Sequence, residues 1–532
     1  MIRRLLSLAV IVCLAAALEG GAAAQANERQ YIVNGRLAAG AAAEPGDDVK
    51  SIEPSGAGMN LYTDPANGYS IRYPAHMTVD AALSAVRTVF SDEQTRIEVY
   101  YDQFSGASTT ADDYIQYGNK FVKASPRHAV TADYWTEVSG YSTHVLKWAR
   151  QPLARVPDDR PNYVCAEIVK NSREVYTVFI KSREPLANAG EIIASLRIVP
   201  RQGAARNDKD LRPSATAFSE ETRSFYHQYF GVGAPQRWGI FEPSAPQSMN
   251  RLGELEDQLE HRFAVLLHYQ MFDDYFPVYG LQNAYENGRY VELTLQTTYA
   301  GEVNALWQNS SRNLTMVYDI LDGKYDDYFS DYARKLKEFG HPVLFRLNNE
   351  MNGDWCWYSA YYTGKDTELY KALWRYVQAV FERNGVDNVI WVWNPHDRSL
   401  PDFKWNNYLM YYPGDECVDV IGLTGYNTGN YFPGETWREF AEIYPPLYNE
   451  SVRLFDKPLM ITEFASNSAG GDKAAWIGQM FRQLKELDRI KVAVWWSGVD
   501  YDREGRPGRV YLIDENDEVV KAFRTGLKDF AQ

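Results

Sequence analysis

The sequence predicts an α/β protein with a (β/α)8 TIM barrel, preceded by a smaller α+β domain. Three observations favour this fold. A length of 532 residues exceeds what one hydrophobic core normally supports, so two domains are expected. Before about residue 200 the chain alternates short β-rich runs with helical stretches, whereas beyond residue 216 long apolar runs alternate with amphipathic segments. About eight such repeats over about 300 residues fit a closed parallel barrel.

The first residues have the pattern of a secretory signal peptide. MIRR is a positively charged start, LLSLAVIVCLAAAL is an apolar core and GGAAAQA is a small-residue cleavage region. The apolar stretch is shorter than the roughly 20 residues that a membrane-spanning helix needs. We therefore expect residues 1–26 to be removed and the mature protein to be secreted or periplasmic, with no insertion into the membrane.

Two segments follow before the barrel region. Residues 27–57 are rich in Ala, Gly, Pro and Glu and show little periodicity, which predicts a flexible spacer. Residues 58–200 combine β-rich runs such as YSIRYP and VYTVFIKS with the helical stretch ADDYIQYGNKFVKA, as expected of an α+β accessory domain. Its opening, YTDPANGYSIRYP, resembles the start of PsbP-like domains. Residues 58–200 carry no recognisable acid pair, nucleophile or metal cluster. We therefore expect this domain to be a spacer, or to bind substrate or dock to a partner.

A polar linker, residues 201–216, leads to the barrel domain at 217–532. Near-continuous apolar strands between amphipathic helices indicate a parallel sheet buried on both faces. The expected strands are RWGIF, RFAVLLHYQ, YVELTLQ, HPVLFRL, VIWVWNP, VDVIGLTGYN, KPLMITEF and IKVAVWW. Helical spacing is clearest in DDYFSDYARKLKEF, TELYKALWRYVQAVFERN and KAAWIGQMFRQLKEL.

The composition narrows the class of ligand. A net charge of −15 argues against a nucleic-acid partner, which needs a basic surface. The aromatic share of 14%, with 38 tyrosines and 14 tryptophans, suits a neutral ligand with flat apolar faces such as a sugar. Outside the signal peptide, Cys165, Cys356 and Cys417 match no metal-binding spacing; Cys356 and Cys417 form either a disulfide or two free thiols. We expect no catalytic metal and no cofactor.

Two glutamates end expected strands. Glu350 follows HPVLFRLNN in the fourth strand, and Glu463 ends KPLMITE in the seventh. Active groups of such barrels lie at the carboxyl ends of the strands, and alternation predicts that Leu459, Ile461 and Glu463 share one face. Alternation likewise places Arg346 and Asn348 on the face of Glu350.

A pair of carboxyl groups about 5 to 5.5 Å apart performs retaining glycoside hydrolysis, one as proton donor and the other as nucleophile. The donor must stay protonated, which burial and a neighbouring negative charge favour. The nucleophile must stay ionised, so it needs donors and positive charge. Tyr426, in VDVIGLTGYN, and Arg346 are the candidates for these two roles.

The neighbours of these residues resemble glycoside hydrolase family 26. That family shows an arginine, then His-Glu-Met-Asn-Gly or a close variant, then a tryptophan-rich segment. The matching residues here are Arg346, Glu350, Met351, Asn352, Gly353, Trp355 and Trp357. The later segments WVWNP, VDVIGLTGYN and ITEFA resemble its fifth, sixth and seventh strand ends. The resemblance implies that Glu350 is the acid/base, that Glu463 is the nucleophile and that Tyr426 holds it.

One residue departs from that family. The family usually has histidine before the acid/base, whereas this chain has Asn349. Asparagine is used there by the wider clan to bind the 2-hydroxyl of the sugar. The mechanism survives this change, but the substrate becomes open among mannan, mixed-linkage β-glucan, β-1,3-xylan and an exopolysaccharide.

Polar and aromatic residues at other strand ends are candidates for substrate binding. Each also has a structural alternative, namely packing in the barrel or at its rim. The candidates are Asn349, Trp355, Trp357, Trp393, Asn394, Trp495, His268 and Gln296. Only one residue of the Trp495–Trp496 pair faces inward, and the resemblance favours Trp495 as the floor under the cleaved sugar. His396 and Asp397 are either rim contacts or turn residues.

The sequence thus predicts a secreted retaining β-glycoside hydrolase acting on a polysaccharide or oligosaccharide. Two alternatives remain. One is a non-catalytic carbohydrate-binding protein on a barrel scaffold. The other is a glycosidase or transglycosylase that processes the exopolysaccharide of its own cell, with the N-terminal domain docking to a partner.

Overall fold

The computed structural model of the chain describes residues 29–38, 44–105, 109–300 and 312–531. The expected signal peptide lies outside these residues. The chain divides into two compact units. The first comprises the chain up to Gln116 together with Ala129–Gln151 and Asp158–Lys209, and the second comprises Tyr117–His128, Pro152–Pro157 and Asp210–Gln532.

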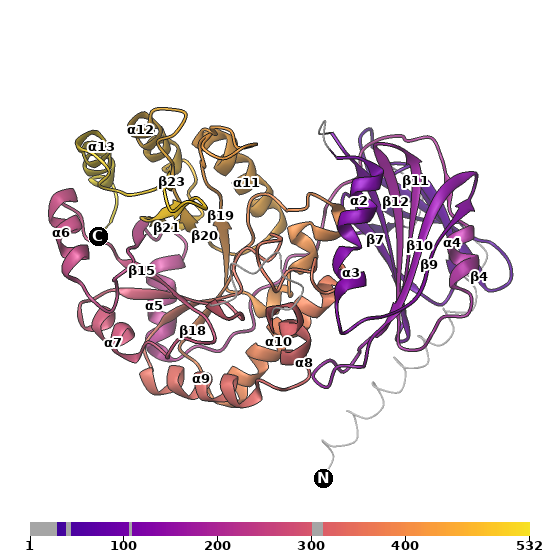
Figure 1. The fold of residues 1–532 in the computed structure, drawn as a ribbon, viewed down its shortest axis with the longest axis horizontal. Helices are drawn as coiled ribbons and strands as arrows, with labels where there is room; N and C mark the ends of the chain where they lie inside the picture. Colours follow the sequence, from indigo (N-terminus) through magenta and orange to yellow (C-terminus); the bar gives the residue numbers. More distant parts are fainter. Residues whose placement is uncertain (1–28, 39–43, 106–108, 301–311, 532) are drawn as a thin grey trace, which may run out of the picture. The chain divides into compact units, whose positions relative to one another are not determined.

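The first unit consists of two antiparallel sheets (Figure 1). One sheet has the order β13-β5-β4-β3-β1-β2 and the other the order β6-β7-β8-β12-β11-β10-β9. The strands are β1 (Gln30–Val33), β2 (Arg36–Ala38), β3 (Val49–Pro54), β4 (Met59–Asp64), β5 (Tyr69–Pro74), β6 (Thr78–Asp80), β7 (Arg87–Ser91), β8 (Thr95–Gln103), β9 (Ala129–Val138), β10 (Tyr141–Ala149), β11 (Asn162–Asn171), β12 (Glu174–Ser182) and β13 (Arg197–Ile198). Helices α2 (Ala111–Gly118) and α4 (Ala189–Ala194) accompany them. Buried side chains of both sheets, among them Tyr62 and Phe90, form one apolar core.

The predicted spacer at 27–57 is wrong for most of its described residues. Strands β1, β2 and β3 lie within it, and β1 pairs with both of the others. The apolar side chains Ile32 and Ile52 are buried in the core of the first unit. Their burial stabilises a segment whose composition alone indicates a flexible chain, so tertiary packing outweighs local composition here.

The second unit is built around a closed barrel of eight parallel strands, as the sequence predicts. The strands are β14 (Arg237–Phe241), β15 (Val265–Gln270), β16 (Tyr290–Leu295), β17 (Val343–Leu347), β18 (Val389–Trp393), β19 (Val420–Thr424), β20 (Leu459–Phe464) and β21 (Ile490–Trp496), which pair in chain order until β21 closes on β14. All eight coincide with the expected apolar runs, because continuous burial on both faces leaves a clear apolar signal.

Helices surround the barrel (Figure 1). They are α5 (Glu220–Phe230), α6 (Asn250–Leu259), α7 (Val278–Glu286), α8 (Met316–Leu321), α9 (Asp326–Phe339), α10 (Thr367–Arg383), α11 (Phe440–Leu454), α12 (Lys473–Leu484) and α13 (Asp517–Leu527). The connection from β18 to β19 instead contains short 3-10 turns at Lys404–Asn406, Tyr408–Tyr411 and Asp415–Cys417. A small hairpin, β22 (Val499–Tyr501) and β23 (Pro507–Val510), follows β21.

The interior of the barrel is filled by side chains from alternate strand positions. Members of this core include Leu267, Leu344, Val392, Met460 and Val494. Helix α5, which precedes the first strand, adds aromatic side chains to the same core. The lower part of the barrel is therefore a packed core, and chemistry is confined to the other end of the strands.

The barrel unit includes two segments from the N-terminal half of the chain. Residues 117–128, which contain α3 (Lys120–Ala124), and residues 152–157 belong to it. The predicted boundary at residue 217 is therefore wrong for these two segments. Short excursions of this kind carry no composition signal that would separate them from the domain around them.

Three further observations concern the cysteines, groups of metal-binding side chains and membrane-spanning helices. Cys165, Cys356 and Cys417 are buried and form no disulfide among the described residues. In the described parts of the chain, no group of three or more His, Cys, Asp or Glu side chains is arranged to hold a metal ion. No helix among the described residues is long and apolar enough to cross a membrane.

The outer layer of the barrel provides a stability test. Trp238 on β14 is fully buried and packs against Phe481 of α12, with ring centroids 4.9 Å apart, and against Phe523 of α13. We expect Trp238→Ala to lower the unfolding free energy of the barrel by about 3–5 kcal/mol, because it leaves a large cavity. Urea unfolding followed by near-UV circular dichroism measures this loss. Val232→Ala is the control, since Val232 is fully exposed; equal unfolding midpoints for the two variants would contradict the expectation.

Candidate active site

Glu350 leaves the end of β17 in an unusual backbone conformation. The strand ends at Leu347, and both Asn348 and Glu350 have positive φ, 55° and 54°. Left-handed backbone at a residue other than glycine costs about 1–3 kcal/mol and persists where the surroundings enforce it. Here the amide of Glu350 donates to the carbonyl of Asn394 at 2.8 Å. Asn348 turns its side-chain oxygen to the amide of Thr297, so simple alternation from Arg346 to Glu350 does not hold.

Glu463 is directed into the barrel by a β-bulge. The register between β19 and β20 shifts after Ile461, so Thr424 pairs with Glu463 and Thr462 is the extra residue. The interior residue of this strand is Met460, and the expected face of Leu459 and Ile461 is wrong. Bulges re-aim side chains beside active sites. The bulge lets Thr462, which contacts Thr424, and Glu463 both lie on the inner side.

Two donors hold the carboxylate of Glu463. Arg346 Nη2 lies 3.0 Å from Glu463 Oε2, and the hydroxyl of Tyr269 donates to the same oxygen. Tyr269 is therefore the phenol that binds this carboxylate, and the role expected of Tyr426 is corrected. Tyr426 lies near Glu463. Burial, and next the charge of Glu463, raises the pKa of its phenol.

Arg346 is itself held on all sides. It is fully buried, and its Nη1 donates to Asn394 Oδ1 at 2.8 Å. Its Nε donates to Thr294 Oγ1 at 2.7 Å. Asn394, expected to bind substrate, is also fully buried and donates to Thr424 Oγ1. It therefore orients Arg346 from below the site.

The carboxyl of Glu350 has the opposite environment. Burial, together with the charge of Glu463, raises its pKa to about 7, although nearby His396 and Trp355 act in the opposite direction. The indole Nε1 of Trp355 donates to Glu350 Oε2 at 3.0 Å, and His396 Nε2 lies 3.8 Å from Oε1. A carboxyl whose pKa is raised to about 7 thus lies near a carboxyl that accepts hydrogen bonds from two donors.

The loop after Glu350 packs tightly around Trp355. A Cβ at Gly353 would lie 2.4 Å from the indole ring of Trp355, so only glycine fits there. Asp354 accepts a hydrogen bond from Tyr117, which stacks on Tyr361 with centroids 4.7 Å apart. Residues of the segment 117–128 thus support the loop that carries the donor to Glu350.

Asn349 and Gln296 are brought together as neighbours. Gln296 Nε2 donates to Asn349 Oδ1 at 3.0 Å, and the hydroxyl of Tyr358 lies 3.2 Å from the same oxygen. These contacts direct the amide oxygen of Asn349 into the protein. Its amide nitrogen is the group left to donate to a ligand.

Three of the four tryptophans expected at the cleft lie elsewhere. Trp357 is buried in its own loop against Tyr362, and Trp393 is fully buried behind β18 against Tyr408, Tyr412 and Phe455. Trp495 is fully buried on the outer face of β21, where it packs against Phe464 and Phe523. Their expected contacts with substrate are wrong, because Trp393 and Trp495 lie on the outer faces of their strands and Trp357 is enclosed within its own loop.

Trp496, not Trp495, lies on the inner side of β21. Its ring stacks on Phe241 at 5.1 Å and meets Tyr426 edge to face at 6.5 Å. Alternation with the interior residues Val492 and Val494 was the available sequence signal for it. The same signal would have selected Tyr269 rather than His268, whose Nε2 faces Gln247 instead.

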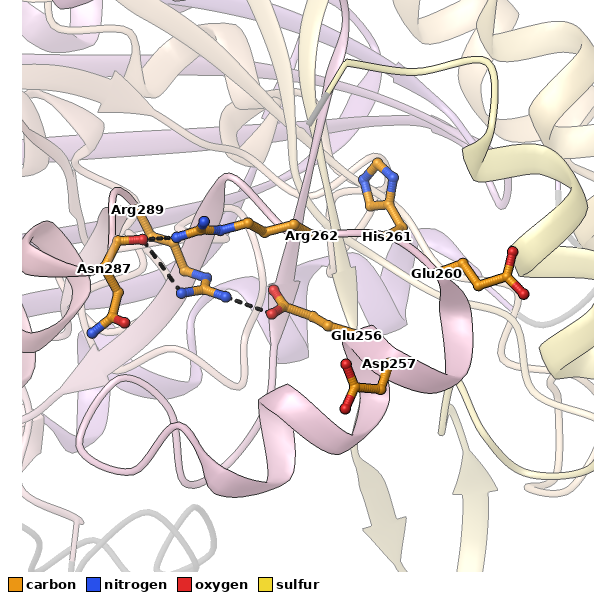
Figure 2. A pocket seen from close by; sticks show the side chains of 7 residues that line it. All are labelled: Glu256, Asp257, Glu260, His261, Arg262, Asn287 and Arg289. Carbon is orange, nitrogen blue, oxygen red and sulfur yellow. Dashed lines mark hydrogen bonds and ion pairs between the residues drawn. The ribbon is translucent and has the colours of Figure 1, made fainter.

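Hollows occur at both ends of the barrel. A cavity of about 400 Å³ lies beside the carboxyl ends of β14 and β21, lined by residues including Glu242, Arg251, Ser497 and Tyr501. Another, of about 480 Å³, lies before β15 and β16, at the amino ends of the strands (Figure 2). There Arg289 joins Glu256 to the backbone oxygen of Asn287. This second hollow is remote from the two glutamates, and its lining contains the ion pair of Arg289 and Glu256.

A barrel with two carboxyls at the carboxyl ends of its strands, one of them with a raised pKa, has the groups that glycoside hydrolysis uses. The particular family that the chain resembles is glycosyl hydrolase family 26, whose model matches residues 298–478. This confirms the resemblance expected from the motifs, and the matched range includes Arg346, Glu350, Tyr426 and Glu463. The likeness of the N-terminal domain to PsbP-like domains stays a prediction.

Characterised relatives match parts of the chain. Endoglucanase H of Acetivibrio thermocellus is 34% identical over 212 residues, which are 39% of this chain and 23% of that protein. A mannan endo-1,4-β-mannosidase of Bacillus subtilis is 28% identical over 193 residues, 35% of this chain and 46% of the relative. The β-1,3-xylanase TXYA of a Vibrio species is 29% identical over 150 residues, 28% of each. The chain therefore spans less than half the length of each of these relatives.

Solved structures also align with the chain. The catalytic domain of a family 26 endo-β-1,4-mannanase from Bacillus sp. JAMB-750 aligns with a TM-score of 0.46 at 19% identity. The alignment covers 61% of this chain and 94% of that one.

The coupling between the two glutamates is measurable without a substrate. The negative charge of Glu463 raises the pKa of Glu350. We therefore expect Glu463→Gln to lower the pKa of Glu350 below about 7, as followed by NMR titration of 13C-labelled glutamate carboxyls. Glu338→Gln, an exposed change on α9, is the control. An unchanged Glu350 titration in Glu463→Gln would show that the two carboxyls do not interact.

Proposed function

We propose that the barrel hydrolyses internal β-linkages of a polysaccharide with retention of configuration, using Glu463 as nucleophile and Glu350 as acid/base. The observation that carries this proposal is the contrast between the two carboxyls. Burial and the charge of Glu463 raise the pKa of Glu350 to about 7, whereas Arg346 and Tyr269 both donate to Glu463. One group is thereby kept as a proton donor and the other as an anion.

The first step breaks the glycosidic bond. The carboxylate of Glu463 attacks the anomeric carbon and forms a glycosyl ester, while the proton of Glu350 passes to the leaving oxygen. The ester carries no negative charge, so the pKa of Glu350 falls. In the second step Glu350 therefore accepts a proton from water, which attacks the same carbon and releases Glu463.

Residues around this pair suit a sugar. The free amide of Asn349 is a donor for a hydroxyl beside the reacting carbon, and Trp355 and Trp496 offer flat apolar faces. The cavity beside β14 and β21, lined by charged and aliphatic residues and by Tyr501, offers room for further sugar units. The named relatives act on a glucan, a mannan and a β-1,3-xylan, so the proposal extends to β-linked polymers as a class.

The proposal places the protein outside the cytoplasm, since residues 1–26 have the signal-peptide pattern. A polymer too large to be taken up must be cut there. Docking to a partner or to substrate is the proposed role of the first unit.

The variants of the two glutamates should differ in a diagnostic way. We expect Glu463→Ala to abolish release of reducing ends from β-mannan, mixed-linkage β-glucan, β-1,3-xylan and bacterial exopolysaccharides. Glu350→Ala should slow cleavage of the polymer by about 10²–10⁴-fold, yet slow an activated aryl glycoside far less, since that leaving group needs no proton. Glu338→Ala is the matched control. Normal hydrolysis by both glutamate variants would refute the proposal; binding of a polymer without cleavage by the parent protein would favour a carbohydrate-binding protein.

The dependence on pH follows from the raised pKa of Glu350. Because the first step needs this carboxyl protonated, kcat/KM on the polymer should fall about tenfold per pH unit above about 7. Initial rates of reducing-end release at low substrate concentration, between pH 5 and 9, measure this. A profile that keeps rising through pH 8 would contradict the assignment of Glu350 as the acid.

A further inference from the structure

A third carboxyl lies beneath the catalytic pair. Glu292 is on β16, two residues before Thr294, so both side chains lie on the inner face of the strand. Glu292 is fully buried, and neither of its carboxyl oxygens has a hydrogen-bond partner among the residues that the structure describes. A fully buried carboxyl without hydrogen bonds is costly, so its presence requires a reason.

Its nearest charged neighbour is the arginine that holds the nucleophile. Arg346 Nε lies 3.3 Å from Glu292 Oε1, while Arg346 Nη2 lies 3.0 Å from Glu463 Oε2. Arg346 Nε donates its hydrogen to Thr294 Oγ1 at 2.7 Å. Glu292 therefore competes with Thr294 for that hydrogen. One buried guanidinium therefore lies close to two carboxyls, to Glu292 through Nε and to Glu463 through Nη2.

The charges of this group decide its protonation. If Glu292 and Glu463 were both ionised, the buried cluster would contain two negative charges and one positive charge, which a low-dielectric interior disfavours. Burial raises the pKa of Glu292 to about 8, with Glu463 acting in the same direction and Arg346 opposing both. Glu292 is therefore neutral in the pH range in which Glu350 is protonated, and it ionises at a higher pH than Glu350.

Of the other groups named around Arg346, Glu350 titrates near this range, with a pKa of about 7, and the rest do not. Tyr269 of β15 places its ring 5.3 Å from the guanidinium, and burial raises the pKa of its phenol well above the usual value. Asn394, directly after β18, and Thr294 of β16 are neutral at every pH. Glu350, beyond the end of β17, interacts with Arg346 through charge alone.

We propose that Glu292 is a positioning residue that regulates the nucleophile by sharing Arg346 with Glu463. When protonated, it leaves the charge of Arg346 to Glu463. When ionised, it draws the guanidinium toward β16 and weakens the contact that keeps Glu463 anionic and aligned. The kinetic part of this inference rests on the proposed hydrolysis; the ionisation itself does not.

The ionisation can be tested without any substrate. A pKa that folding raises contributes stability that is fully present below the unfolded value and is lost as pH rises through the folded value, here about 8. The urea midpoint of the parent protein should therefore fall from pH 6 to pH 9 more steeply than that of Glu292→Gln. Because Glu350 is also protonated at pH 6, the infrared test uses Glu350→Gln as the background. Glutamate-labelled Glu350→Gln protein should show a protonated carboxyl band at pH 6 that disappears by pH 9 and is absent when Glu292→Gln is added. Absence of that band in Glu350→Gln at pH 6 would overturn the proposal.

The effect on the nucleophile needs a substrate that makes the proton of Glu350 unnecessary. For a 2,4-dinitrophenyl β-glycoside of the sugar that the polymer panel identifies, kcat/KM of the parent protein should fall up to tenfold per pH unit above 8, whereas Glu292→Gln should stay level to pH 9. Glu338→Gln should follow the parent. Equal alkaline losses in parent and Glu292→Gln would overturn the regulatory role even if the infrared band is present.

A third variant covers a folding defect. If Glu292→Gln does not fold, Glu292→Met, which has similar volume and no charge, is measured in the same way. If no glycoside is cleaved at all, the proposed function fails, while the infrared and urea measurements still decide whether Glu292 ionises as inferred.

Discussion

The buried guanidinium of Arg346 is the group on which the rest of the site depends. Removing an arginine from water is expensive, and the cost is offset only by close partners of complementary character. This one has a carboxylate of β20, a hydroxyl of β16 and the amide oxygen of Asn394, the residue directly after β18. Each partner is in turn buried and hydrogen-bonded, so the barrel must close correctly before the charge is compensated. Fold and site are therefore stabilised by the same contacts.

The two glutamates differ in their contact with the charge of Arg346. Glu463 lies within direct reach of Arg346, whereas Glu350 is held by an indole and lies near an imidazole. A bulge on one strand and a left-handed turn on another thus place two identical side chains in different surroundings. The backbone irregularities are a means of positioning these side chains.

The barrel was predictable from the sequence because buried parallel strands leave continuous apolar runs, and both glutamates were predictable because they end two such runs. The wrong assignments share a cause. Trp393 and Trp495 were chosen for their chemistry, but the side of the strand on which they lie depends on its alternation, and both face the helices. Tyr269 was missed although it continues the inner row of Val265 and Leu267. The bulge before Glu463 depends on pairing with β19, which no local pattern encodes.

Segment 117–128 makes the barrel unit discontinuous along the chain. Its Tyr117 and Phe121 pack on Tyr361 and Tyr362, in the loop that also carries Trp355. A chain shortened to start at residue 217 would keep every strand of the barrel yet lose the aromatic cover of that loop. The two units therefore cannot be separated by a single cut. A gene fusion that transfers the barrel unit to another protein must therefore also transfer the segment 117–128.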